Sequence, residues 1–124
     1  MGALVLGGSL WLVSGCGCSD AGCPASLELR VPTELASITE RVELVGAEGR
    51  EGCDRMAPTD CRFEVREDGE LWVVFTDAPP VFDVTIRDRA GAPLFERTVR
   101  PEFETSQPNG PDCAPTCEHA VVEL

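Results

Sequence analysis

The chain has 124 residues, a length that suits one domain, and a formal net charge of −12. Its 22 acidic residues face ten basic ones, all of them arginine, and this excess argues against binding to nucleic acid or adhesion to anionic lipid head groups. Seven cysteines in so short a chain indicate a disulfide framework formed in an oxidising compartment. Their spacings include no C-x-x-C pair, so a structural zinc site fits poorly.

The first segment is uncharged from Met1 to Ser19 and is most apolar over Ala3–Val13. An apolar run of this length, followed by small residues, is typical of a secretory signal. A membrane-spanning helix needs about 20 predominantly apolar residues, and the glycines and serines here make this segment a poor candidate.

The run ends in Val13-Ser14-Gly15-Cys16, an aliphatic residue and two small residues before a cysteine. This motif resembles the lipobox of bacterial prolipoproteins. The resemblance implies that the Cys16 thiol carries a lipid and that residues 1–15 are a cleaved signal peptide, which leaves residues 16–25 as a lipidated tether. It also implies the outer membrane of a Gram-negative cell, because Gly17 stands where aspartate would retain the protein at the inner membrane. An ordinary secretory signal and an uncleaved membrane anchor are the alternatives.

Beyond the tether, alternation of apolar and polar residues predicts half-buried strands. The pattern covers residues 27–31, 61–66, 82–87 and 94–99, and 121–124 form a last candidate. Asp68-Gly69 predicts a type I′ hairpin turn into residues 71–76, whose continuous apolar run indicates a central strand covered on both faces. Ala90-Gly91-Ala92-Pro93 predicts a second hairpin.

Residues 33–45 fit helical spacing as well as strand alternation, and the surrounding strands favour a strand. Residues 46–60 and 101–115 have no such pattern and are predicted to be long loops held by disulfides. With about seven strands, residues 26–124 are predicted to form an all-β, antiparallel β-sandwich, either immunoglobulin-like or transthyretin-like.

An odd number of cysteines leaves one without a disulfide partner, and acylation of Cys16 accounts for it. The six disulfide candidates are Cys18, Cys23, Cys53, Cys61, Cys113 and Cys117. Short separations favour the pairs Cys53–Cys61 and Cys113–Cys117, with Cys18–Cys23 by elimination. Alternatively Cys61, on the inward face of its strand, bonds across the sandwich to Cys23, Cys113 or Cys117.

Catalytic chemistry has little support in the sequence. His119 is the only histidine and lies two residues from Cys117, but that cysteine is better explained as half of a disulfide. Calcium suits an acidic chain, yet the D-x-D-x-D-G series is absent. We therefore expect no catalytic residue, metal site or cofactor.

The leading hypothesis from the sequence is a cell-envelope lipoprotein with a structural or interaction role. Its partners would be the membrane, through the lipid anchor, and an envelope protein or glycan. The alternative is an extracytoplasmic binding module that takes carbohydrate, peptide or calcium through its long loops.

Overall fold

The computed structural model describes residues 22–23 and 25–124, and this part of the chain is all-β, with its strands in two sheets. The strands are β2 (Leu27–Arg30), β3 (Arg41–Val45), β4 (Arg50–Asp54), β5 (Cys61–Val65), β6 (Leu71–Phe75), β7 (Phe82–Arg87), β8 (Pro93–Val99), β9 (Glu104–Ser106) and β10 (Cys117–Glu123). The predicted fold class is confirmed as a sandwich-like arrangement, with nine strands in the described residues rather than about seven.

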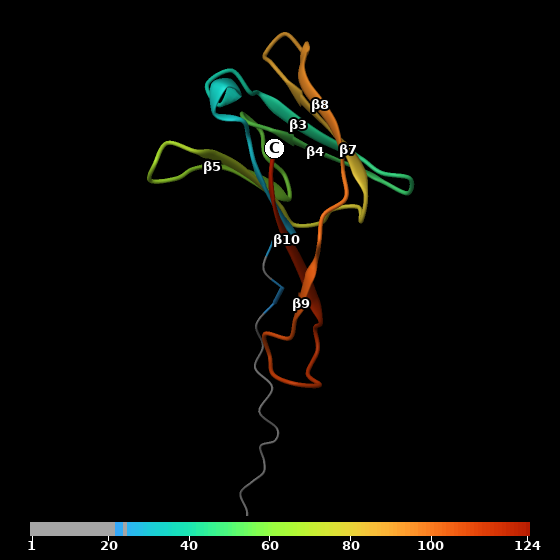
Figure 1. The fold of residues 1–124 in the computed structure, drawn as a ribbon. Helices are drawn as coiled ribbons and strands as arrows, with labels where there is room; N and C mark the ends of the chain where they lie inside the picture. Colours follow the sequence, from blue (N-terminus) through green and yellow to red (C-terminus); the bar gives the residue numbers. More distant parts are fainter. Residues whose placement is uncertain (1–21, 24) are drawn as a thin grey trace, which may run out of the picture.

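The first sheet has the order β5-β6-β2-β10-β9 and the second has the order β4-β3-β7-β8. Neighbouring strands are antiparallel except β2 and β10, which are parallel, with Ala120 opposite Leu27. Because β2 and β10 are parallel, both begin at the same end of the domain. Figure 1 shows β9 and the first part of β10 projecting from that end. We call this end, with Cys23 and residues 107–117, the base.

The core lies between the two sheets and is built by alternate residues of the inner strands. Its members in β2, β3, β6 and β7 are each no more than 2% exposed. They are Leu27, Leu29, Val42, Leu44, Leu71, Val73, Phe75, Phe82, Val84 and Ile86. The period of two that predicted the strands is therefore the alternation between the buried and outer faces of each sheet.

Strand β6 is buried along its whole length, as its apolar sequence predicted. On its outer face, Trp72 is covered by charged side chains. The Arg66 guanidinium lies 4.1 Å from the centroid of the Trp72 ring, and the indole Nε1 donates a hydrogen bond to Glu70. A cation over an indole face with its N–H satisfied lets a large aromatic side chain lie on the outside of the sheet.

Residues 33–45 are a strand only in their second part. A 3₁₀ turn, η2 (Thr33–Leu35), precedes β3. The buried Thr39 hydroxyl donates to the Leu35 carbonyl and stabilises this turn, while Ile38 is 47% exposed. The apolar residues that fitted helical spacing are thus divided between a turn and a strand.

The prediction of a loop over residues 46–60 is wrong for its central part, because β4 pairs with β3 there. Its sequence, REGCD, has no apolar alternation, since β4 is an edge strand and charged side chains are common on such edges. The Arg41 guanidinium lies directly over Gly52, so a side chain there would require the arginine to move. Strand β9 similarly interrupts the predicted loop over 101–115.

The turn between β5 and β6 differs from the predicted type I′. Gly69 has a positive φ of 84°, but Asp68 does not. The Gly69 N–H donates to the Arg66 carbonyl, and the Arg66 N–H donates to the Glu70 carbonyl. This is a type I turn followed by a left-handed glycine, the usual three-residue hairpin connection. The prediction of a hairpin is confirmed and its turn type is wrong.

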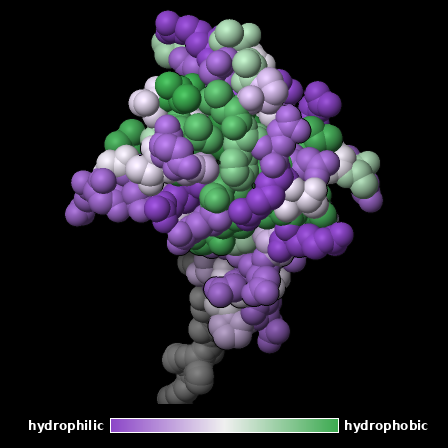
Figure 2. All heavy atoms as spheres, turned by 45° about the horizontal axis from the view of Figure 1, so that its top comes forward, coloured by the Kyte–Doolittle hydropathy of each residue, from purple (hydrophilic) through white to green (hydrophobic). Residues whose placement is uncertain are grey.

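The sandwich does not cover all of its apolar side chains. Partly buried apolar residues border the core, among them Leu35, Phe95 and Leu124. Figure 2 shows hydrophobic side chains gathered across the middle of the face in view, with hydrophilic side chains around them.

Candidate functional site

The base of the domain is held by a disulfide between Cys23 and Cys117, whose Cα atoms are 5.5 Å apart. Ser26, just after Cys23, donates its N–H to the Phe75 carbonyl and accepts from the Ala120 N–H. The segment that enters the domain is therefore joined covalently to the start of β10 and by hydrogen bonds to β6 and β10. A pull on the chain before Cys23 would act directly on the first sheet.

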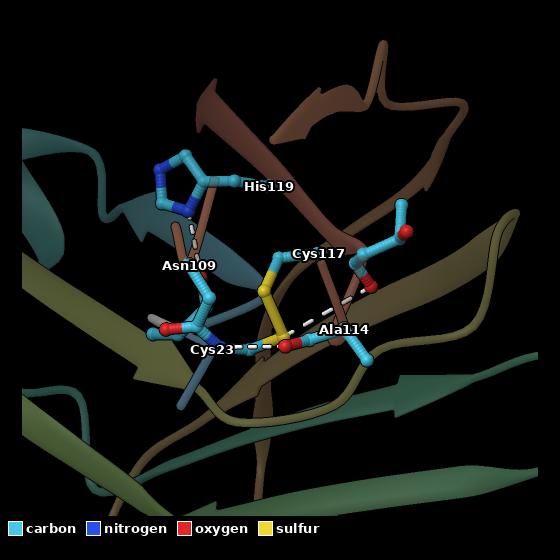
Figure 3. Close-up of a disulfide and its surroundings, with 7 residues drawn as sticks. Cys23, Asn109, Ala114, Cys117 and His119 are labelled. Carbon is cyan, nitrogen blue, oxygen red and sulfur yellow. Dashed lines mark hydrogen bonds between the residues drawn. A yellow bond between two sulfur atoms is a disulfide. The ribbon is translucent and has the colours of Figure 1, made fainter. Parts of the chain in front are cut away.

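The loop that leads into β10 is organised around Asn109, which is only 4% exposed. Its side-chain Nδ2 donates to the Ala114 carbonyl at 2.7 Å (Figure 3). The Cys113 N–H donates to the Gly110 carbonyl within the same loop. Cys113 is also disulfide-bonded. The sequence predicted a long loop held by disulfides here, and the buried asparagine side chain was not part of that prediction.

His119 takes part in a surface network rather than in a Cys–His pair, because the Cys117 sulfur is committed to its disulfide (Figure 3). Its Nδ1 lies 2.6 Å from the Ala25 carbonyl oxygen and its Nε2 lies 2.9 Å from a carboxylate oxygen of Glu28. Glu28 also pairs with Arg66. The histidine thus connects the entering segment with the charged outer face of the first sheet.

The same face carries Glu64 between two arginines. Arg62 and Arg66 both donate hydrogen bonds to its carboxylate, and Arg62 contributes most to holding the pKa of Glu64 below its ordinary value. The outer face of the second sheet repeats the arrangement. Arg41 and Arg87 lie 2.9 Å from the two Glu43 oxygens and lower the pKa of this carboxyl in that order.

Of the predicted disulfides, Cys53–Cys61 is confirmed. The pairs Cys113–Cys117 and Cys18–Cys23 are wrong, since Cys23 and Cys117 bond to each other. The parallel arrangement of β2 and β10 brings the starts of these two strands together, and a preference for short separations could not anticipate this. Cys16 and Cys18, with the predicted signal peptide, lie outside the described residues.

The bond between Cys53 and Cys61 also crosses the sandwich. Cys53 lies on β4, the edge strand of the second sheet, and Cys61 lies on β5, the edge strand of the first. The sequence offered a local pair and a cross-sandwich bond as alternatives for Cys61. The local pair is confirmed and the bond from Cys61 to Cys23, Cys113 or Cys117 is wrong. The local bond nevertheless joins the two sheets, because β4 and β5 are neighbours in sequence but belong to opposite sheets.

A second feature is an open hollow of about 440 Å³ between the β3–β4 turn and the link from β6 to β7. We call it the apolar hollow. Its lining residues are Ala47, Glu48, Gly49, Glu51, Asp77, Ala78, Pro79, Pro80 and Val81. The sequence placed part of this surface in a long loop, but the two contributing segments are far enough apart that no motif joined them.

The described residues contain no group of three or more His, Cys, Asp or Glu side chains placed to hold a metal ion. In the same part of the chain, no helix has the length and apolar character needed to cross a membrane.

The disulfides indicate a non-cytoplasmic, oxidising compartment, as the cysteine count predicted. No protein-family model, curated protein or solved structure matches the chain.

Proposed function

We propose that this chain is a lipoprotein of the cell envelope, anchored through Cys16, whose domain has a structural or interaction role without enzymatic activity. The observation that carries the proposal is the Val13-Ser14-Gly15-Cys16 motif, placed seven residues before a cysteine that is bonded to the domain. Two or more acyl chains anchor a protein stably, whereas one is marginal. The lipid would attach the protein to the membrane, and the chain that follows Cys16 would enter the domain at the base.

The short connection sets how far the domain stands from the membrane. Seven residues span at most about 25 Å when fully extended, at roughly 3.3–3.6 Å per residue. Because Cys23 is fixed to β10, the first sheet would lie within this distance of the lipid. We infer an anchored domain with little reach, suited to a partner in or near the same membrane.

Cysteine pairing gives the proposal a second consequence. Cys113 is disulfide-bonded, and the pairs Cys23–Cys117 and Cys53–Cys61 do not include it. If the Cys16 thiol carries lipid, Cys18 is the partner of Cys113. Peptide mapping without reduction should then find a Cys18–Cys113 link, and a Cys16–Cys113 link would contradict the anchor.

The test of the anchor compares Cys16→Ser with Cys18→Ser, the same change two residues further on. Cys16→Ser should lose the acyl mass and leave the detergent phase on phase partition. Cys18→Ser should remain acylated and membrane-bound even if its fold is weakened. Intact-mass spectrometry of both proteins reports cleavage and acylation together. Unchanged mass and partition of Cys16→Ser would refute the proposal.

A second candidate function, an extracytoplasmic binding module, is favoured by the apolar hollow. Concave, mostly apolar sites of about 300–1,000 Å³ with a few polar groups are typical of ligand pockets. Thermal unfolding in the presence of peptides, glycans or calcium tests this role. A stabilisation that a variant of the hollow abolishes would support it, and no stabilisation by any of them would count against it.

A further inference from the structure

The walls of the apolar hollow are held together before any ligand arrives. The Gly46 N–H donates to the Gly49 carbonyl at 2.8 Å, which closes the β3–β4 turn. Gly46 also approaches Pro79 so closely that a Cβ atom would collide with the proline ring. Pro79 and Pro80 have restricted backbone angles, which limits movement of the opposite wall. A preformed cavity of this kind loses little conformational entropy when it binds.

Two kinds of side chain line the hollow. Alanine, proline and valine supply an apolar surface, and the carboxylates of Glu48, Glu51 and Asp77 supply negative charge. Glu51 is half-buried, while Glu48 and Asp77 are exposed. No arginine lines the hollow, and none of these three carboxylates forms an ion pair within the described residues.

This distinguishes the hollow from the outer faces of the sheets. There the carboxylates of Glu28, Glu43 and Glu64 each contact one or more arginines. The carboxylates of the hollow have no such cation, so their charge is available to a ligand. An apolar wall beside uncompensated carboxylates fits a ligand that carries a cation on an apolar stem.

We propose that the apolar hollow binds a peptide segment of a partner protein that presents an arginine beside an apolar residue. An arginine side chain places its methylene stem on apolar surface while its planar guanidinium donates to carboxylates. The adjacent apolar residue fills the space over Pro80 and Val81. This inference rests on the binding role proposed above and names its ligand class, whereas the lipid anchor is independent of it.

The test uses the full chain in detergent micelles and fluorescein-labelled, amidated ALRLA, with ALQLA as the uncharged peptide. Anisotropy should show saturable binding of ALRLA that weakens with added salt, and little binding of ALQLA. Amide shifts in ¹⁵N–¹H spectra should concentrate in residues 46–51 and 76–81. Glu48→Gln with Glu51→Gln should weaken binding about threefold to tenfold, as expected for two partly exposed ion pairs.

The matched control is Glu67→Gln with Glu96→Gln, which removes the same charge from exposed carboxylates outside the hollow. It should bind ALRLA as the unmodified chain does. Equal weakening by both double variants would mean general attraction to an acidic protein and would overturn the proposal. Arginine amide bound as tightly as ALRLA would also overturn it, because the site would then take a small cation alone.

The remaining outcomes separate this inference from the binding role itself. If ALRLA shifts no amide of the hollow, the ligand class is wrong. If a glycan or calcium then stabilises the protein through the same residues, the binding role survives with another ligand. If ALRLA does not bind and neither a glycan nor calcium stabilises the protein, the binding role is refuted. The lipid anchor is not affected by this outcome, because acylation at Cys16 is measured separately.

Discussion

The disulfides Cys53–Cys61 and Cys23–Cys117 connect different parts of the domain. Cys53–Cys61 joins residues eight positions apart and fastens the edge strands of opposite sheets. Cys23–Cys117 joins residues 94 positions apart and fixes the entering chain to the last strand. The first closes one edge of the sandwich, and the second closes nearly the whole chain into a loop. Sequence separation alone therefore says little about what a bond does in three dimensions.

The two disulfides are expected to stabilise the fold by different amounts, because they restrict the entropy of the unfolded chain differently. A cross-link constrains the unfolded chain more as its loop lengthens, from about 3 kcal/mol for 15 residues to about 4.7 kcal/mol for 100 residues. On this account the bond at the base stabilises the domain more than the bond at the edge.

The largest effect is expected from Cys23→Ala with Cys117→Ala. Both this pair and its reference protein carry Cys113→Ala, so that the disulfide of Cys113 cannot restrict the unfolded chain in its place. Relative to that reference, the free energy of unfolding should fall by about 4 kcal/mol. Urea titration followed by circular dichroism measures the change. A loss below 1 kcal/mol would show that the unfolded chain is restricted by other means.

A smaller effect is expected from Cys53→Ala with Cys61→Ala. The loop is short, so the entropic loss should be about 2–3 kcal/mol. The same urea titration applies, and hydrogen exchange should show faster opening of β4 and β5 than of β2 and β10. If this pair destabilises the domain more than the pair at the base, fastening the sheets matters more than loop length.

Gly46→Ala tests the contact that shapes the apolar hollow. The added methyl group would meet the ring of Pro79, and overpacking of this kind costs about 1–3 kcal/mol. Gly49→Ala is the matched control in the same turn, because a Cβ atom there meets nothing within 4 Å. Thermal unfolding of both variants should separate them. Equal melting temperatures would mean that the Gly46–Pro79 approach is not tight.

Acid should weaken the domain through Glu43, whose pKa is lowered by Arg41 and then by Arg87. A lowered folded pKa gives stability that is present above the unfolded pKa and is lost as pH falls through the folded value. The loss should therefore begin below about pH 5. Glu43→Gln should reduce this pH dependence by less than about 1 kcal/mol, measured as urea midpoints between pH 7 and pH 3. An unchanged slope would mean that the pair is screened by water.

Much of the fold followed from local pattern. Alternation placed β2, β5, β7 and β8, and the unbroken apolar run placed β6 in the interior of its sheet. Asp68-Gly69 and Ala90-Gly91 marked both hairpins, although the first turn type was wrong. These features were predictable because side-chain direction and turn conformation depend on a few neighbouring residues.

Other features had no local signal. Strand β4 lacks alternation because it is a charged edge, and only its pairing with β3 identifies it as a strand. The apolar hollow combines residues 47–51 with residues 77–81, two segments that lie side by side where Gly46 approaches Pro79 and Val81. Neither could be read from a single segment, because each depends on contacts between segments.

The cysteines show most clearly what the sequence determined and what the tertiary structure determined. The sequence alone determined that a disulfide framework exists, because the number of cysteines in a short chain is a matter of composition. Only the tertiary structure decided that Cys23 meets Cys117 and that Cys53–Cys61 crosses between the sheets. The physical reason is that a disulfide requires two Cα atoms within about 4.4–6.8 Å, and strand topology sets this distance for distant residues.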